Sequence, residues 1–143
     1  MGELYCSCIP GLVLHTLRPN SFTPPGWNTV TPRIVVREPE RFVTFLQHVF
    51  AATGSFERFK PSVLRIGDSL IMVSEAGPRQ VAPAFLYVYV ADIDAAYRRA
   101  LEAGALSLEA PSDLPYGDRR CMLEDPWGNL WQIATHVSQS SPA

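Results

Sequence analysis

Three aromatic side chains occur at every second position of one short segment, Phe85, Tyr87 and Tyr89. Residues two apart in a strand point to the same face of a sheet, so this spacing predicts a row of three rings on one surface. Such a row can stack against a flat or bulky ligand, at ~0.5–1.5 kcal/mol per aromatic pair beyond burial. The alternative is that the rings fill the interior of a closed barrel. As a row, they favour a surface that binds a small molecule.

Other side chains in the predicted strands suit the same surface. Arg33 can stack on a ring or bind a carboxylate, and Gln132 can both donate and accept hydrogen bonds. Met72 offers a soft, adaptable wall. His136 lies four positions after Gln132, hence on the same strand face, and is a base, a rim contact or a structural histidine.

Two further polar motifs have structural interpretations. Asp118 and Arg119 precede a strand, and they either close a loop over the cleft or pair with each other. The segment 125–129, Asp-Pro-Trp-Gly-Asn, has the chemistry of a turn, because proline fixes φ and glycine permits positive φ. No catalytic role is needed for it, and we expect no catalytic residues.

Two amphipathic helices must lie beside these strands. Their apolar positions follow the helical stripe i, i+3, i+4, i+7, i+8, and the second stripe repeats the first at a constant offset of 51 positions. Asp92 or Asp94 is placed to cap the second helix, and Gly104 follows its end. The two stripes are Phe42, Phe45, Leu46, Val49, Phe50 and Ile93, Ala96, Tyr97, Ala100, Leu101.

Strand signals surround each helix in the same order. A β-rich run precedes each helix, at residues 31–37 and 85–90, and a hairpin follows, at 63–73 and 121–133. A further short strand is expected near Phe56 and near residues 106–108. The pattern predicts an α+β fold made of a βαβββ module present twice.

Strand alternation also assigns the faces of these sheets. One parity is entirely apolar and is expected to face the helices: Ile34, Val36, Ile71, Val73, Leu86, Val88, Val90, Trp131 and Ile133. The other parity mixes aromatic, apolar and polar groups, as in a ligand cleft with a few orienting hydrogen bonds. It comprises Thr31, Arg33, Val35, Leu70, Met72, Ser74, Phe85, Tyr87, Tyr89, Leu130, Gln132 and Ala134.

Length and composition restrict the domain organisation and the partners. The 143 residues suit one domain, at residues 29–137, with modules at about 29–76 and 84–137. The proline- and glycine-containing residues 1–28 are predicted to form an extended arm, and residues 138–143 a flexible tail. With a net charge of -2, the chain lacks the overall positive charge that favours binding to nucleic acid or to an anionic membrane. A small neutral or cationic ligand therefore fits better.

The cysteines and the hydropathy pattern bear on location. There are three cysteines, Cys6, Cys8 and Cys121, and an odd number is typical of a reducing compartment rather than a disulfide framework. The apolar run at residues 9–14 lacks the basic segment of a signal peptide, and no stretch approaches membrane-spanning length. We therefore expect a cytoplasmic protein.

Several short motifs in one order make the chain similar to a known superfamily. They are Tyr116-Gly117-Asp118-Arg119-Arg120, then residues 124–131 (EDPWGNLW), then Ala134-Thr135-His136-Val137, after tandem βαβββ modules. In these features the chain resembles the vicinal oxygen chelate superfamily, specifically its glyoxalase and bleomycin-resistance branch, over about residues 30–137. The resemblance implies an open, mixed-sheet, barrel-like cup with the ligand on its concave face. It also implies a homodimer.

Catalytic members of that superfamily place four metal ligands, typically His and Glu, on the first and last strand of each module. The matching positions here are Thr31, Met72, Phe85 and Gln132. A divalent transition metal needs imidazole, carboxylate or thiolate donors, and none of the four supplies one. A shift of any strand by one residue brings no better donor. We therefore expect neither a metal nor another cofactor.

The resemblance and the missing donors together predict a metal-free protein that sequesters an aromatic or hydrophobic small molecule, of which an antibiotic is one example. The expected ligand-binding residues are Arg33, Met72, Phe85, Tyr87, Tyr89, Gln132, Tyr116 and Trp27, with Trp27 reaching across a dimer. One alternative is a metal-dependent lyase, isomerase or dioxygenase whose metal site is rebuilt from Glu75, Glu124 and His136. Another is a metal-independent enzyme using Tyr87, Arg33 or His136, which a buried titratable pair beside the cleft would favour.

Overall fold

The computed structural model describes residues 22–77 and 81–137, so most of the predicted arm, with Cys6 and Cys8, and the predicted tail lie outside the described residues. The chain divides into two units, Met1–Val30 and Thr31–Ala143. All the regular elements described below belong to the second unit.

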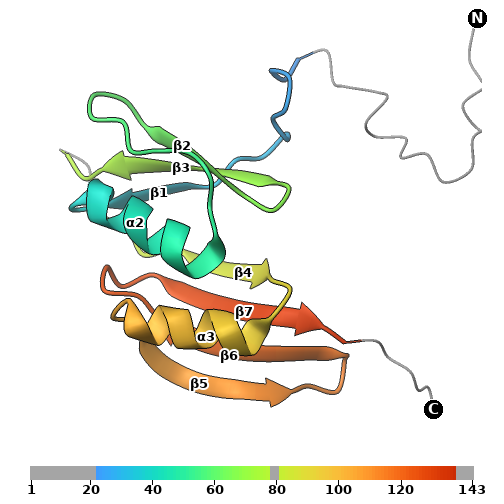
Figure 1. The fold of residues 1–143 in the computed structure, drawn as a ribbon. Helices are drawn as coiled ribbons and strands as arrows, with labels where there is room; N and C mark the ends of the chain where they lie inside the picture. Colours follow the sequence, from blue (N-terminus) through green and yellow to red (C-terminus); the bar gives the residue numbers. More distant parts are fainter. Residues whose placement is uncertain (1–21, 78–80, 138–143) are drawn as a thin grey trace, which may run out of the picture. The chain divides into compact units, whose positions relative to one another are not determined.

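The first module begins with strand β1 (Arg33–Val36), which leads into helix α2 (Pro39–Phe50). Strands β2 (Ser62–Ile66) and β3 (Ser69–Glu75) follow as a hairpin. The sheet has the order β1-β3-β2, with β1 parallel to β3 and β2 antiparallel to β3 (Figure 1). The extra strand expected near Phe56 is not formed in the described part of the module. Instead, Thr53 and Arg65 make a single isolated bridge.

The second module repeats the arrangement with one more strand. It contains β4 (Phe85–Tyr89), α3 (Ile93–Glu102), β5 (Leu106–Asp113), β6 (Asp118–Glu124) and β7 (Leu130–His136). Its sheet has the order β4-β7-β6-β5, with β4 parallel to β7 and the other pairs antiparallel. The predicted α+β fold of two related modules is therefore confirmed. Both sheets are open, so the closed-barrel alternative is wrong.

Both helices form where the apolar stripes predicted them. Helix α2 has Pro39 in its first turn, where the missing N–H costs nothing, and it ends at Ala51 in the left-handed region. In α3 the cap is Asp92, whose carboxylate accepts from the Ala95 N–H at 3.1 Å. Every predicted stripe residue of α2 is buried, whereas Leu101 of α3 is 38% exposed and is an exception to the prediction.

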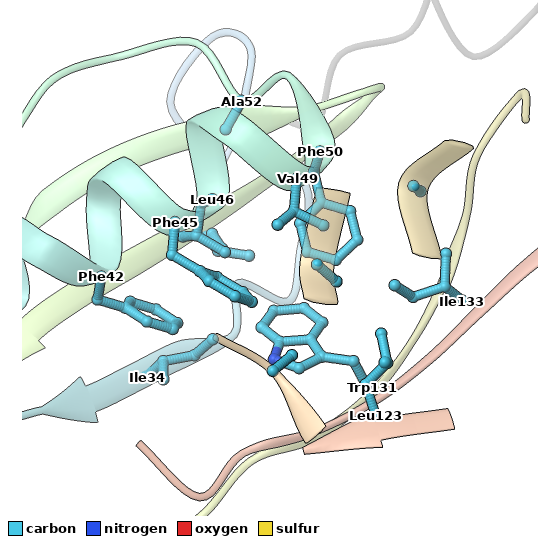
Figure 2. Close-up of a cluster of buried hydrophobic side chains, with 14 of the residues drawn as sticks. Ile34, Phe42, Phe45, Leu46, Val49, Phe50, Ala52, Leu123, Trp131 and Ile133 are labelled. Carbon is cyan, nitrogen blue, oxygen red and sulfur yellow. The ribbon is translucent and has the colours of Figure 1, made fainter. Parts of the chain in front are cut away.

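The hydrophobic core lies between the helices and one face of the strands, and the two modules share it (Figure 2). The side chains of α2 pack toward Trp131 of β7, and the ring centroids of Phe50 and Trp131 are 4.9 Å apart. The strand residues predicted to face the helices belong to this core or pack against it, among them Ile34 and Ile133. Within residues 22–77 and 81–137, no helix covers the opposite face of either sheet, and we call this the open face. No helix of the described ranges is long and apolar enough to cross a bilayer.

Candidate ligand-binding site

The open face of the second sheet carries the predicted aromatic row. Phe85, Tyr87 and Tyr89 are 60%, 38% and 59% exposed, in contrast to the core-facing residues between them. The rings of Tyr87 and Tyr89 are tilted by 50° with centroids 5.3 Å apart. In the neighbouring strand β7, the residues opposite the three rings are Leu130, Gln132 and Ala134. Gln132 therefore lies beside Tyr87, as a polar group next to the row.

A turn with a buried carboxylate holds the start of this row in place. Asp125 accepts hydrogen bonds from the backbone N–H groups of Trp127 and Asn129, each at 2.9 Å, and from the Trp131 indole N–H at 2.8 Å. The Asn129 side-chain oxygen accepts from the Ala84 N–H at 2.9 Å, directly before Phe85. These bonds agree with the interpretation of residues 125–129 as a structural turn.

Asp118 is the central polar group of the site. Its side chain is buried, at 1% exposure, and Oδ2 accepts the hydroxyl protons of Tyr87 at 2.6 Å and Tyr89 at 2.8 Å. Its Oδ1 lies 2.9 Å from His136 Nδ1. Strand pairing produces this meeting, since Asp118 and His136 are directly opposite in β6 and β7. One carboxylate thus orients two tyrosines and a histidine.

The pKa values of these groups follow from their contacts. Hydrogen bonds from the Tyr87 hydroxyl and from His136 lower the pKa of Asp118 below its ordinary value. Partial burial and donation to the Asp118 carboxylate raise the pKa of Tyr87. Donation to the same carboxylate also raises the pKa of Tyr89. At neutral pH the site therefore holds one ionised carboxylate and two protonated phenols.

The network continues to Tyr116 and Arg120. The Tyr116 and Tyr87 hydroxyls are 3.0 Å apart, and because Tyr87 gives its proton to a carboxylate, Tyr116 is the donor of this pair. Arg120 reaches the Tyr116 oxygen at 3.5 Å and forms an ion pair with Glu109 at 2.9 Å. Its Nε is the buried side-chain atom that has no hydrogen-bond partner within the described ranges.

The predicted residues of the first sheet lie together on its own open face. Arg33 and Met72 are paired neighbours in β1 and β3. Arg33 is exposed, and its Nε donates to the Ser74 hydroxyl at 2.8 Å. Trp27 belongs to the separate unit Met1–Val30, so its predicted role stays a prediction.

A cavity of about 290 Å³ lies beside strand β4. Tyr87 and Tyr89 contribute to its wall, together with the β2–β3 turn and its Asp68 carboxylate. The complete lining is Pro32, Ile66, Gly67, Asp68, Ser69, Ile71, Leu86, Tyr87, Val88, Tyr89 and Trp131. The volume is close to the lower end of the range for small-molecule sites, at roughly 300 Å³.

The donor set does not fit a divalent metal. Thr31, Met72, Phe85 and Gln132 offer a hydroxyl, a thioether, a phenyl ring and an amide. Within residues 22–77 and 81–137, no three His, Cys, Asp or Glu side chains are grouped so that they could hold an ion.

The rebuilt set of Glu75, Glu124 and His136 is also not brought together. Glu124 pairs with Leu130 at one end of the β6–β7 ladder, whereas His136 pairs with Asp118 at the other. Six residues of extended strand separate these ends, or ~20 Å. Glu75 lies on β3, in the other sheet. The hypothesis of a metal centre built from these three ligands is therefore wrong for this fold.

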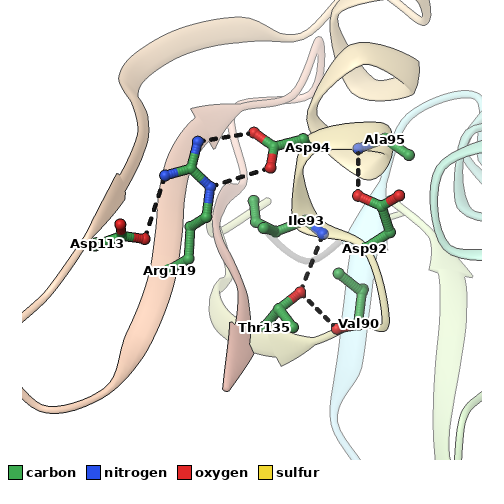
Figure 3. A network of polar contacts seen from close by, with 8 residues as sticks. All are labelled: Val90, Asp92, Ile93, Asp94, Ala95, Asp113, Arg119 and Thr135. Carbon is green, nitrogen blue, oxygen red and sulfur yellow. Dashed lines mark hydrogen bonds and ion pairs between the residues drawn. The ribbon is translucent and has the colours of Figure 1, made fainter. Parts of the chain in front are cut away.

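Arg119 and Asp118 do not form the expected pair. Arg119 binds the Asp94 carboxylate through two hydrogen bonds, at 3.0 and 3.1 Å, and lies 3.3 Å from Asp113 (Figure 3). In the same view the Thr135 hydroxyl joins the Ile93 N–H to the Val90 carbonyl. Successive strand residues point to opposite faces, so Asp118 turns to the open face and Arg119 toward α3.

Comparison with known proteins identifies a family for this chain. The sequence profile of the Glyoxalase/Bleomycin resistance protein/Dioxygenase superfamily matches residues 27–133. The uncharacterized protein Mb0911c of Mycobacterium bovis is 26% identical over 128 residues, covering 77% of this chain and 84% of that protein.

Solved structures show the same fold. TioX from Micromonospora sp. ML1 superposes with a TM-score of 0.64 at 23% identity, covering 77% of this chain and 99% of that one. The fosfomycin resistance protein FosX from Mesorhizobium loti gives a TM-score of 0.59 at 18% identity, covering 77% and 92%. At these identities the likeness concerns the fold.

Proposed function

Because the chain belongs to the Glyoxalase/Bleomycin resistance protein/Dioxygenase superfamily, we propose that it is a metal-free protein that binds and sequesters an aromatic or hydrophobic small molecule. The observation that carries the proposal is the composition of the open face. Three exposed rings, Phe85, Tyr87 and Tyr89, lie there, and the two tyrosine hydroxyls are held by Asp118. The four positions that hold a metal in catalytic relatives carry no suitable donor. Capture by stacking needs no chemical step.

The residues assigned to binding are those predicted from the sequence: one group on each sheet, and Trp27. The aromatic row with Gln132 and Tyr116 provides stacking surface and hydrogen bonds on the second sheet. Arg33 and Met72 provide a cationic and an apolar contact on the first sheet. Trp27, which belongs to the separate unit Met1–Val30, is retained as a proposed binding residue. An antibiotic fits this description of the ligand, and one structural neighbour, FosX, is named as a fosfomycin resistance protein.

A homodimer is part of the proposal. The open face of the second sheet exposes large apolar side chains on several strands, including Phe85 and Leu106, which is typical of a surface covered by a partner. A second copy would enclose the ligand from the other side. We place the protein in the cytoplasm, which the odd number of cysteines supports.

The proposal is tested on purified full-length protein. Elemental analysis should find no stoichiometric metal, and native mass spectrometry of protein taken directly from its source cells should find a retained small molecule on a dimer. The double variant Tyr87→Ala/Tyr89→Ala should lose that molecule, whereas Glu40→Gln, on the first turn of α2, should keep it. A tightly held, stoichiometric metal ion would contradict the metal-free function.

A second candidate function rests on the Asp118–His136 pair. A buried carboxylate that accepts from Nδ1 fixes the tautomer of the imidazole and leaves Nε2 as an acceptor. The His136 side chain is 60% exposed, so a ligand on the open face can reach it. This arrangement suits a metal-independent general base. Chemical change of the recovered ligand after incubation, abolished in His136→Gln, would establish catalysis; unchanged ligand would leave binding alone.

A further inference from the structure

The hydroxyl groups of Tyr87 and Tyr89, here called the tyrosine pair, already donate their protons within the protein. A phenol has one proton to give, and both Tyr87 and Tyr89 give theirs to Asp118 Oδ2, at 2.6 and 2.8 Å. The Tyr87 oxygen also receives the Tyr116 hydroxyl at 3.0 Å. Tyr89, at 59% exposure, therefore presents only oxygen lone pairs to a ligand. A group that binds this oxygen must be a hydrogen-bond donor.

The ring faces of the pair have the same preference. A cation is attracted to the negative face of an aromatic ring, and a hydrogen bond from the phenol to a carboxylate increases the electron density of that ring. The two rings are tilted by 50° at 5.3 Å, so they form two sides of an angle rather than a flat stack. A compact charged group can contact both faces.

The charges around the pair also favour a positive ligand. The charged residue in the lining of the cavity is Asp68, and the Asp118 carboxylate lies directly behind the two hydroxyls. Arg120, the arginine of the same open face, is held by Glu109 at 2.9 Å. The attraction between opposite unit charges a few ångströms apart acts in the same direction.

We propose that the ligand of this site is an organic cation, an aromatic molecule whose protonated amine lies against Tyr87 and Tyr89 in front of Asp118 and beside Asp68. This inference rests on the proposed binding function and specifies its ligand class. The ammonium group donates to the Tyr89 oxygen and contacts the ring faces, while the aromatic part of the molecule occupies the cavity and the row toward Phe85.

Three probes of the same size and different charge test the ligand class: naphthylmethylammonium, naphthylmethanol and naphthoate. Isothermal titration of the full-length protein should give the tightest binding for the ammonium probe, at least about fivefold tighter than the alcohol, as expected for one cation–π contact of ~1 kcal/mol. Naphthoate should bind most weakly. Equal or tighter binding of the alcohol or the carboxylate would overturn the cation assignment and leave the binding function intact. Binding of none of the three would count against both.

Matched variants identify the groups responsible. Asp118→Asn should reduce the preference for the ammonium over the alcohol to less than about twofold, and Tyr89→Phe, which keeps the ring, should reduce it in part. Glu40→Gln removes an equal charge from the first turn of α2 and should leave the preference unchanged. If Asp118→Asn fails to fold, Asp68→Asn on the exposed β2–β3 turn gives the same test. A preference that survives in Asp118→Asn, Tyr89→Phe and Asp68→Asn would overturn the proposal.

Discussion

At the scale of single residues, the two buried carboxylates Asp125 and Asp118 have different roles. Asp125 satisfies backbone and indole donors inside a turn, so its role is to hold the chain. Asp118 accepts from side chains that reach the open face, so its role is to orient a surface. Both are almost fully buried, at 3% and 1% exposure. The hydrogen-bond donors that an aspartate binds, rather than its degree of burial, therefore distinguish a structural aspartate from one that organises a site.

Replacing Asp125 should destabilise the fold. Asp125→Ala leaves two backbone N–H groups, the Asn129 amide and the Trp131 indole N–H without their acceptor. Since each unsatisfied buried donor costs ~1–3 kcal/mol, we expect the free energy of unfolding to fall by about 3 kcal/mol or more. Urea denaturation followed by tryptophan fluorescence measures it. A loss under about 1 kcal/mol would show that water replaces the carboxylate.

Asp118 should make stability depend on acid pH. Its folded-state pKa is lowered, so the ionised carboxylate stabilises the fold above the unfolded-state pKa of ~3.9, and this contribution is lost as pH falls through the folded-state value. Between ~pH 5 and 2, Asp118→Asn should therefore lose less stability than the unchanged protein. Parallel denaturation curves over this range test the sign. Identical acid dependence in both proteins would contradict it.

At the scale of elements, the sequence predicted what depends on local pattern. The stripes of α2 and α3 and the inward parity of Ile34 and Ile133 are confirmed because apolar periodicity follows directly from burial. The prediction of a short strand near Phe56 was wrong, since the described residues there form an isolated bridge between Thr53 and Arg65 instead of a strand. The sequence pattern alone does not show whether a segment at the edge of a sheet has a neighbouring strand long enough to pair with it.

The register between strands explains what the sequence missed in the site. The aromatic row follows from alternation within one strand, which is readable in the sequence. The partners of Asp118 depend on β6 and β7 pairing so that residues 118 and 136 are opposite, 18 positions apart. The hairpin 121–133 was predicted, and extending its ladder outward by three residues from Cys121 and Ile133 would have found this pair. Arg120 and Glu109 needed the further register of β5, which bulges interrupt.

Two glycines in connecting segments allow a matched test. Gly54 has φ +111°, and a Cβ there would lie 2.6 Å from the Val63 carbonyl oxygen. Gly67 also has positive φ, +60°, but a Cβ would meet nothing within 4 Å. We expect Gly67→Ala to cost ~1 kcal/mol from backbone conformation alone, and Gly54→Ala clearly more. Thermal unfolding of both variants measures the difference. Equal losses would mean that the clash is relieved by a shift of the strand.

At the scale of the folded unit Thr31–Ala143, the modules are joined by one core rather than by two. Phe50 ends the helix of the first module, and Trp131 lies in a central strand of the second. Their ring contact at 4.9 Å connects the two sequence repeats. The repeats should therefore unfold together, although each contains its own sheet.

Truncation of Phe50 tests this coupling. Phe50→Ala should lower the free energy of unfolding by ~3–5 kcal/mol, the range for a large buried ring, and unfolding should remain a single transition. Leu101→Ala, at a 38% exposed position, is the control and should cost much less. Coincident curves by tryptophan fluorescence and far-ultraviolet circular dichroism are expected. Two separate transitions would show that the modules are independent.

The absence of helices from the open faces has a consequence for how this protein can change over generations. Neighbouring residues of each strand have separate roles, since Leu86 packs against the core while Tyr87 is exposed on the open face. Substitutions at the exposed outward positions, such as Phe85, should cost little folding stability, so related proteins can acquire new chemical preferences without losing the fold. The surface chemistry of the sheets can thus be altered while the buried side of each strand stays the same.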